Sequence, residues 1–358
     1  MNRTGLALTA LVVAVVLAFA TAQAATPSLP TDAGGADITQ YMPKNSSILV
    51  NINVSKLANT GIFDTLKQMA GEEAFAELTA LGIDPAKDIK QLMIGVVVDR
   101  ENPENDPAVY MALSGNFPPA SKFIEAYKAA EESDPETREV GGKTIYTMDD
   151  MDWCFLDGVV LLVPLEADAD VAQMLGGVKE SVVQNVELTG LMKNVNTQAT
   201  VWGIASLPEE LRAVMAEDGE NAPFDVKTLQ TISGSFDYAE KVAADVVFGF
   251  TGEEGPQGLV TYWDTNVKPT AEAMGQQIPA IATLIAACEI KASGKAATFK
   301  FSMAQTDFDA AIKGMVQMMF GGMVPVENGA EVENGGDEGT TEDDTNGDDN
   351  GDGGNEEW

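Results

Sequence analysis

Residues 139–148 read EVGGKTIYTM: a short strand segment, a two-glycine turn and a second strand that carries an aromatic residue. Paired glycines between strand-forming runs are typical of a tight β-hairpin, because glycine adopts the positive φ angles of such turns. Residues 291–303, KASGKAATFKFSM, repeat this pattern, with a turn at Ser293-Gly294 followed by lysine and an aromatic strand. The local match predicts two halves that are built on the same plan.

The predicted elements around these hairpins follow one order in both halves: strand, helix, two strands, helix and strand pair. Alternating apolar residues predict the strands, and apolar residues at helical spacing predict the helices. The fold class that we predict is therefore α+β: two tandem halves of β-α-β-β-α-β-like order, with antiparallel sheets packed against helices on one face. The elements of the first half are expected at 47–54, 55–78, 89–98, 108–115, 118–132 and 137–164. Those of the second half are expected at 199–206, 207–217, 227–238, 242–251, 267–288, 289–303 and 306–320.

Changes in composition along the chain predict its organisation. We expect six segments: a signal peptide (1–24), an N-terminal linker (25–39), a first α+β half (40–180), a connecting segment (181–198), a second α+β half (199–326) and a disordered acidic tail (327–358).

The first residues have the three parts of a secretory signal peptide. Arg3 is basic, residues 6–19 are without charge and mostly apolar, and Ala22-Gln23-Ala24 is a small-x-small cleavage site. We therefore expect an exported protein of the periplasm or extracellular space, without a membrane span in its mature form. An uncleaved N-terminal anchor is the alternative.

The chain is strongly acidic, with 56 Asp and Glu against 21 Lys and Arg and a net charge of -35. Such a charge repels nucleic acid and anionic lipid, so neither is an expected partner. The tail at 327–358 holds 13 of the acidic residues and no basic residue. A segment of this composition buries too little apolar surface to fold, and we expect it to be disordered.

The tail contains DDNGDG, which resembles the start of a calcium-binding EF-hand loop. Asp348, Asn350 and Asp352 match the first three ligand positions, and Gly353 matches the required glycine. The bidentate glutamate would fall one residue after Trp358. We therefore expect weak, non-stoichiometric association with divalent cations at most, and no cofactor.

Histidine is absent from the sequence. This excludes Ser-His-Asp and Cys-His catalysis and the histidine-based zinc sites, so a non-enzymatic protein is the favoured prediction. Cys154 and Cys288 lie in different halves. In an exported protein they could form a disulfide, and two free buried cysteines are the alternative.

Two groups of carboxylates are candidates for acid–base chemistry. One holds Asp149, Asp150 and Asp152, and the other holds Glu166, Asp168 and Asp170. Paired carboxylates can hydrolyse glycosides, but charge runs in an acidic chain are more often solvated surface, and that is the interpretation we favour.

Four segments resemble a group of exported bacterial proteins of unknown function, a family with tandem α+β halves. They are MPKNSSILVNINVSKL (42–57), GIDPAKDIKQL (82–92), GGKTIYTMDDMDWCFLDGVVLLVP (141–164) and SVVQNVELTGLMKNVNTQATVW (181–202). The resemblance rests on turn and strand motifs and covers roughly 40–310. It implies an extracytoplasmic protein, and it provides no catalytic residues to transfer.

Three hypotheses follow. The favoured one is an exported, non-enzymatic protein of the cell envelope or extracellular space, with a binding or structural role towards an unknown partner there. One alternative is a carrier that holds an apolar ligand between a curved sheet and its helices. The other is a carboxylate-based hydrolase.

Overall fold

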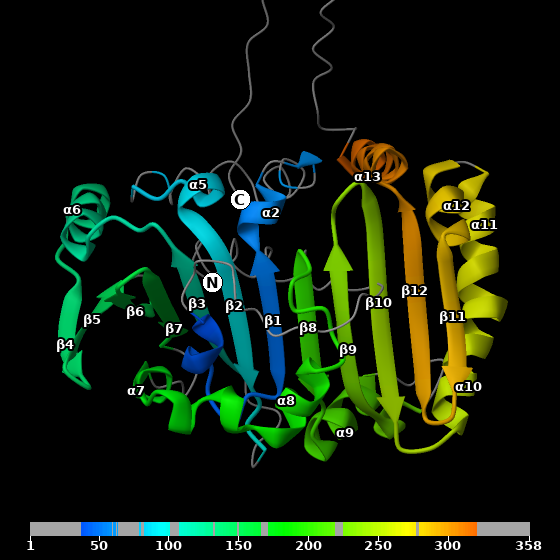
Figure 1. Cartoon of the computed structure of the whole chain (residues 1–358), viewed down its shortest axis with the longest axis horizontal. Helices are drawn as coiled ribbons and strands as arrows, with labels where there is room; N and C mark the ends of the chain where they lie inside the picture. Colours follow the sequence, from blue (N-terminus) through cyan, green and yellow to red (C-terminus); the bar gives the residue numbers. More distant parts are fainter. Residues whose placement is uncertain are drawn as a thin grey trace, which may run out of the picture.

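A computed structural model describes residues 37–58, 60, 61, 63, 79, 82–100, 107–131, 133–148, 150–165, 171–218, 225–276 and 279–320. The described residues form an α+β fold around one 12-stranded sheet (Figure 1). From edge to edge, the strand order is β11-β12-β10-β9-β8-β1-β2-β3-β7-β6-β5-β4, and all neighbouring strands are antiparallel.

The strands agree closely with those predicted. Those of the first half are β1 (Ile48–Asn53), β2 (Ile89–Val97), β3 (Ala108–Gly115), β4 (Glu136–Val140), β5 (Lys143–Met148), β6 (Met151–Leu156) and β7 (Val159–Pro164). Those of the second half are β8 (Val201–Ser206), β9 (Leu229–Asp237), β10 (Lys241–Phe250), β11 (Cys288–Ser293) and β12 (Ala296–Ala304).

Helices connect the strands. The α-helices are α2 (Val54–Leu57), α5 (Pro85–Asp88), α6 (Ala120–Glu131), α7 (Val171–Leu175), α8 (Val186–Met192), α9 (Glu209–Asp218), α10 (Glu254–Tyr262), α11 (Lys268–Gly275), α12 (Pro279–Ala286) and α13 (Gln305–Phe320). The shorter turns are η1 (Ile38–Tyr41), η2 (Val178–Glu180), η3 (Val182–Gln184), η4 (Val226–Thr228) and the π-helical η5 (Trp263–Val267). Among the described helices, none has the length and apolar character needed to cross a bilayer.

β1 joins the two halves at the centre of the sheet. It pairs with β2 on one side and with β8 on the other, so that Ile52 lies opposite both Leu92 and Val201. The sequence predicts sheets in each half, and the structure shows that they are parts of one sheet. β1 begins with three consecutive apolar residues, Ile48, Leu49 and Val50, because both of its faces are covered.

The hairpin at 139–148 forms as predicted. Gly141 and Gly142 both have positive φ angles, 57° and 73°, as a type I′ turn requires. The turn closes between Val140 and Lys143, which are opposite each other in the β4–β5 pair. A residue with a Cβ atom would be strained at either glycine.

One face of the sheet, which we call the wide face, carries apolar side chains along the whole sheet order from β6 through β1 to β11. Leu57 of α2, Leu284 of α12 and Phe308 of α13 pack against it. Aromatic rings fix α13 in place, because Phe308 lies 5.8 Å from Phe301 and 6.1 Å from Phe236 between ring centroids. Buried members of the wide face include Ile52, Leu92, Ile94, Met111, Leu162, Val246 and Phe301.

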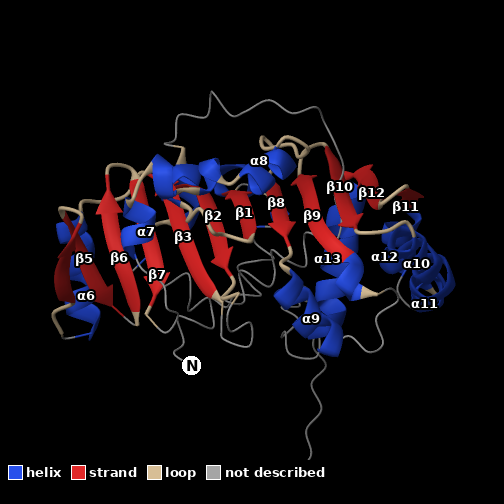
Figure 2. Ribbon diagram, turned by 90° about the horizontal axis from the view of Figure 1, so that it is seen from below, coloured by secondary structure: helices blue, strands red, loops and turns tan. Residues whose placement is uncertain are grey.

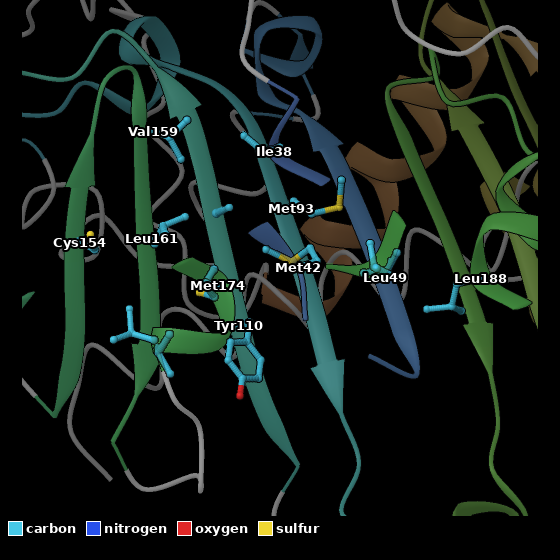
Figure 3. Packing of buried hydrophobic residues seen from close by; sticks show 14 of the residues in the cluster. Ile38, Met42, Leu49, Met93, Tyr110, Cys154, Val159, Leu161, Met174 and Leu188 are labelled. Atoms are coloured by element: carbon cyan, nitrogen blue, oxygen red, sulfur yellow. The ribbon is translucent and has the colours of Figure 1, made fainter. Parts of the chain in front are cut away.

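The opposite face is also covered, over the first half and β8. Figure 2 shows α8 on one side of the sheet and α9 and α13 on the other. Side chains from η1, α7, η3 and α8 pack there against β1, β2, β3 and β7 (Figure 3). The prediction of helices on one face was therefore wrong. The residues at 181–198, expected only to connect the halves, form η3 and α8, and Leu188 is fully buried. Ile38, at the end of the predicted linker, is buried in the same layer.

The helical region before β11 begins earlier than predicted, at Glu254 rather than near residue 267. The sequence does not predict this helix start, because glycine and proline, here Gly255 and Pro256, both have low helix propensity. In the structure, a Cβ atom at Gly255 would lie 2.4 Å from the Phe250 ring. Glycine is needed at this position for close packing, although it lowers the helix propensity.

Candidate functional site

Polar side chains gather where three central strands have neighbouring ends. β1 ends at Asn53, β8 begins after Thr200, and β9 ends at Asp237, so register brings these residues together. The Asn53 side chain accepts a hydrogen bond from the Lys56 amide (3.1 Å) and thereby caps α2, which places Lys56 over the strand ends. We call Lys56, Thr200, Asp237, Tyr238, Gln305 and Asp309 the junction network.

Asp237 lies at the centre of the junction network. Its Oδ1 accepts from the Thr200 amide (3.2 Å), from the Thr200 hydroxyl (3.1 Å) and from the Lys56 ammonium (3.3 Å). Lys56 also donates to the Gln198 carbonyl (2.6 Å). The Thr200 Oγ1 in turn accepts from the Tyr238 amide (2.9 Å). These bonds tie a helix of the first half to strands of the second.

The Tyr238 side chain extends the junction network to α13. Its hydroxyl donates to Asp309 Oδ1 (2.6 Å) and accepts from Gln305 Nε2 (3.0 Å). Burial, and then the neighbouring Asp309 carboxylate, raise the pKa of Tyr238 to about 12.

The junction network holds elements together rather than presenting a reactive group. Tyr238 is neutral at physiological pH and its hydroxyl has partners on both sides. Asp237 receives three hydrogen bonds, each of which stabilises the carboxylate where it is. Sequence reasoning missed this network because members that are directly bonded to each other are separated by up to 181 positions.

The wide face provides a second candidate site, of apolar character. Many of its side chains are only partly buried, among them Val50, Val96, Val109, Leu113, Phe117, Trp153, Phe155, Ile232, Phe248 and Met303. The rings of Trp153 and Phe155 on β6 stack with their centroids 6.3 Å apart. The ring of Phe123 on α6 lies about equally close to both, with centroid distances of 5.1 Å to Trp153 and 5.0 Å to Phe155. The Trp153 Nε1–H is shielded from solvent and has no acceptor among the described residues. An indole donor in this state is uncommon, because buried polar atoms normally find a partner.

The two cysteines lie at distant places in the sheet. Cys154 is on β6 and Cys288 is on β11, with eight strands between them. Nine interstrand steps of about 4.8 Å separate them by roughly 40 Å, whereas a disulfide needs Cα atoms within about 7 Å. Both thiols are free, so the disulfide considered from the sequence does not form within the chain. Burial raises the pKa of Cys154 to about 11 and that of Cys288 to about 12.

The first carboxylate group suggested by the sequence includes Asp152 on β6, whose side chain has a structural role. Asp152 is 1% exposed and binds both terminal nitrogens of Arg138, with Arg138 Nη1 at 2.7 Å from Asp152 Oδ1. Thr147 donates a further bond to Asp152 (2.9 Å). Asp150 lies on the exposed turn before β6. The remaining members, Asp149, Glu166, Asp168 and Asp170, are outside the described residues.

The suggested cation ligands Asp348, Asn350 and Asp352 also lie outside the described residues. Within the part of the chain that the structure describes, no three Cys, Asp or Glu side chains are grouped so that they could hold a metal ion.

Comparisons with known proteins give similarities to solved structures alone. No protein family model and no curated protein matches the chain. Crystal form I of TP0453 is similar at 9% identity and a TM-score of 0.45, over 79% of this chain and 98% of that one. Crystal form IV of TP0453 has 9% identity and a TM-score of 0.41, over 76% and 95%.

Proposed function

We propose that the chain is an exported, non-enzymatic protein that acts by binding in the cell envelope or extracellular space. The observation that supports it best is the wide face, which presents partly exposed apolar side chains across both halves of the sheet. Apolar side chains that stay partly exposed can form a recognition site. The signal-like residues 1–24 support export.

Two measurements on protein from its own cells test this proposal. Mass spectrometry should find a mature chain that begins at residue 25, in the periplasmic or extracellular fraction. Photo-crosslinking from the wide face, with a probe at Val109, should trap a discrete partner that a probe at the exposed Lys268 does not trap. An uncleaved chain in the cytoplasm would contradict export, and identical products from both probes would contradict the binding surface.

A carrier of an apolar ligand is the second candidate, favoured by the indole N–H of Trp153, which has no acceptor in the described part of the chain and lies within an aromatic cluster. A ligand with an apolar body and one hydrogen-bond acceptor would satisfy that donor and cover the neighbouring rings. Native mass spectrometry of the host-purified protein should then show a bound small molecule, which is reduced in Trp153→Phe and retained in Trp263→Phe. A clean apo mass would eliminate the carrier.

The carboxylate hydrolase gains no support from Asp152, because that carboxylate is buried and bound to Arg138. A general acid or base must reach a substrate proton, and this group has no free approach.

We also propose that the halves are tandem copies of one unit, as in the family that the sequence resembles. The sheet order supports this. In each half, three consecutive strands run outward from the centre, a helical segment leads to the outer edge, and the last strand returns to pair with the third. The first half differs by one extra hairpin, β4–β5, and the counterpart of β11–β12 in the sheet order is β6–β7. The sequence match between 139–148 and 291–303 therefore does not pair equivalent hairpins. An experimental structure in which β1-β2-β3-β7 did not superpose on β8-β9-β10-β12 would refute the duplication.

A further inference from the structure

The aromatic cluster of Phe123, Trp153 and Phe155 lies where α6 covers the wide face. Figure 1 shows α6 at the end of the sheet that β4 and β5 form. Ile124 and Tyr127 of α6 pack into the same cluster as Phe123. The other positions of α6 whose side chains are described are exposed or partly buried. The helix is thus attached to the sheet along one apolar stripe.

Apolar side chains around this cluster remain in contact with water. Those that are only partly buried are Val54, Leu113, Phe117, Tyr146, Trp153 and Phe155. An apolar molecule that lies against such side chains removes them from water, and this burial is the main favourable contribution to the binding of apolar ligands. The partly buried side chains of the cluster can therefore hold an alkyl chain.

One polar atom within this apolar cluster is left to a ligand. The Nε1–H of Trp153 is shielded from solvent, and the residues that the structure describes offer it no acceptor. A donor that has lost water without gaining an acceptor is unfavourable, and a bound molecule with one acceptor would remove that cost. The cluster therefore fits a ligand with an alkyl chain and at least one hydrogen-bond acceptor.

The pairing of β4, β5 and β6 shows which charged side chains share a face with Trp153. Trp153 lies opposite Tyr146, so that both side chains are on the wide face. Because side chains alternate along a strand, the β4–β5 register puts Glu139 on the wide face as well. The same alternation puts Arg138 and Lys143 on the opposite face. Among the described residues of these three strands, the charged side chain on the wide face is therefore an acidic one.

The basic residues of α6 are also not available to the cluster. Lys128 forms an ion pair with Asp134, and the Lys122 side chain is exposed. A carboxylate or phosphate that is removed from water without a cation beside it is strongly unfavourable. The net charge of -35 adds a general repulsion of anions. The acceptor that binds the indole is therefore an uncharged oxygen.

We propose that the cluster between α6 and β6 binds a neutral amphiphile. The alkyl chain of this molecule lies against the partly buried apolar side chains, and an ester carbonyl, amide carbonyl or alcohol oxygen accepts a hydrogen bond from Trp153 Nε1. The proposal rests on the carrier function put forward above and adds the chemical class of the ligand. A fatty acid anion has the same chain and is rejected because of its charge.

Two ligands that differ only in charge test the proposal. The mature full chain, extracted to remove any bound lipid, is titrated in a calorimeter with the methyl ester of a brominated fatty acid, and separately with the same acid as its anion at neutral pH. The ester should bind at least about tenfold more tightly than the anion. Equal affinities, or tighter binding of the anion, would refute a neutral ligand.

Two matched tryptophan variants test the position of the ligand. Trp153→Phe keeps an aromatic ring but loses the donor, and it should bind the ester about tenfold more weakly. Trp263→Phe, in η5 at the other end of the sheet, should keep the wild-type affinity. Circular dichroism of both variants checks that they are folded.

The bromine atom gives a second measurement, because it quenches the fluorescence of an indole that it touches. Saturating ester should quench the wild type and Trp263→Phe, but not Trp153→Phe. Equal quenching or equal affinity in the two variants would show that the ligand does not lie at Trp153. If the ester does not bind at all, the ligand site is refuted, whereas crosslinking from Val109 still decides whether the wide face binds a partner.

Discussion

Arg138 and Asp152 differ in exposure, and this decides what each contributes. Asp152 is buried at 1% exposure, while the Arg138 side chain is 45% exposed. When the carboxylate is lost, the guanidinium can turn to water. When the guanidinium is lost, the carboxylate remains buried, with Thr147 as its remaining side-chain partner among the bonds described above.

Arg138→Ala is therefore expected to destabilise the protein more than Asp152→Asn. We expect about 3 kcal/mol for Arg138→Ala, because it leaves an uncompensated buried charge. Asp152→Asn should cost about 1 kcal/mol, since the amide keeps some of the hydrogen bonds. Urea unfolding of both variants measures the difference, and the opposite ranking would show that Asp152 is hydrated in solution.

Tyr238 gives a prediction for alkaline pH. Its pKa is raised from 10.0 to about 12 in the folded state, so the folded protein holds the phenolic proton more tightly than the unfolded chain does. The associated stability is fully present below pH 10 and is lost as the pH rises to 12. Tyr238→Phe should cost about 1 kcal/mol at neutral pH.

The cost of Tyr238→Phe should then decrease between pH 10 and 12, as measured by urea unfolding at several pH values. Comparison with the wild type at each pH removes the contribution of Cys154 and Cys288, which titrate in the same range in both proteins. A cost that is constant with pH would show that the hydroxyl is not buried against Asp309.

The cysteines should behave as two free thiols, with Cys154 buried and Cys288 partly buried. Because burial raises the pKa values of Cys154 and Cys288 to about 11 and 12, neither is a thiolate at neutral pH, and the thiolate is the reactive form. Ellman's reagent should therefore react slowly with the native protein and with two thiols per chain in urea. A mass two daltons lower, with no thiol released in urea, would instead indicate a disulfide.

At the scale of elements, α10 depends on a glycine. Gly255→Ala should destabilise the protein by about 1–3 kcal/mol, because the added methyl group would overlap the Phe250 ring, with a separation of 2.4 Å in the present packing. Gly252, in the preceding turn, is the matched control, since a Cβ atom there would meet nothing within 4 Å. Thermal unfolding of both alanine variants measures the effect. Equal melting temperatures would show that the ring moves aside without cost.

Local signals explain which elements the sequence predicts correctly. Alternation and turn glycines place the strands and hairpins, because both signals depend on residues a few positions apart. The helix start at Glu254 is not predicted from the sequence, because the next residue, Gly255, has low helix propensity. Glycine is required there by the close contact with the Phe250 ring, which the sequence does not reveal. The cover formed by η3 and α8 is missed because the connecting segment shows no long periodic pattern.

The candidate sites depend on distant pairing and were not predictable. Tyr238 meets Asp309 71 positions later, and Lys56 meets Asp237 181 positions later. No spacing rule connects such residues until the order β1-β8-β9 is known. The separation of Cys154 from Cys288 has the same origin, because sheet order, rather than sequence distance, sets it.

At the scale of the whole molecule, the shared sheet should make the halves unfold together. Ile52→Ala on β1, the strand that joins the two halves, removes contacts with strands of both halves. It should lower the free energy of unfolding by about 2–5 kcal/mol. Hydrogen exchange followed by mass spectrometry, in increasing urea, should show β2–β3 and β9–β10 opening at one midpoint, which the variant lowers equally. Lys268→Ala, on the exposed side of α11, should leave it unchanged. Two separate midpoints would show that the halves are independent.

The central position of β1 has a consequence for the time course of folding. β1 is the first of the described strands to be synthesised, yet one of its sides stays open until residues 201–206 arrive to form β8. A nascent first half therefore carries an exposed hydrogen-bonding edge in the middle of the future sheet while about 150 further residues are added, which at typical synthesis rates takes on the order of ten seconds. Non-local pairing of this kind slows folding, so a holding chaperone should be needed most during that interval, with β1 as the segment that it protects.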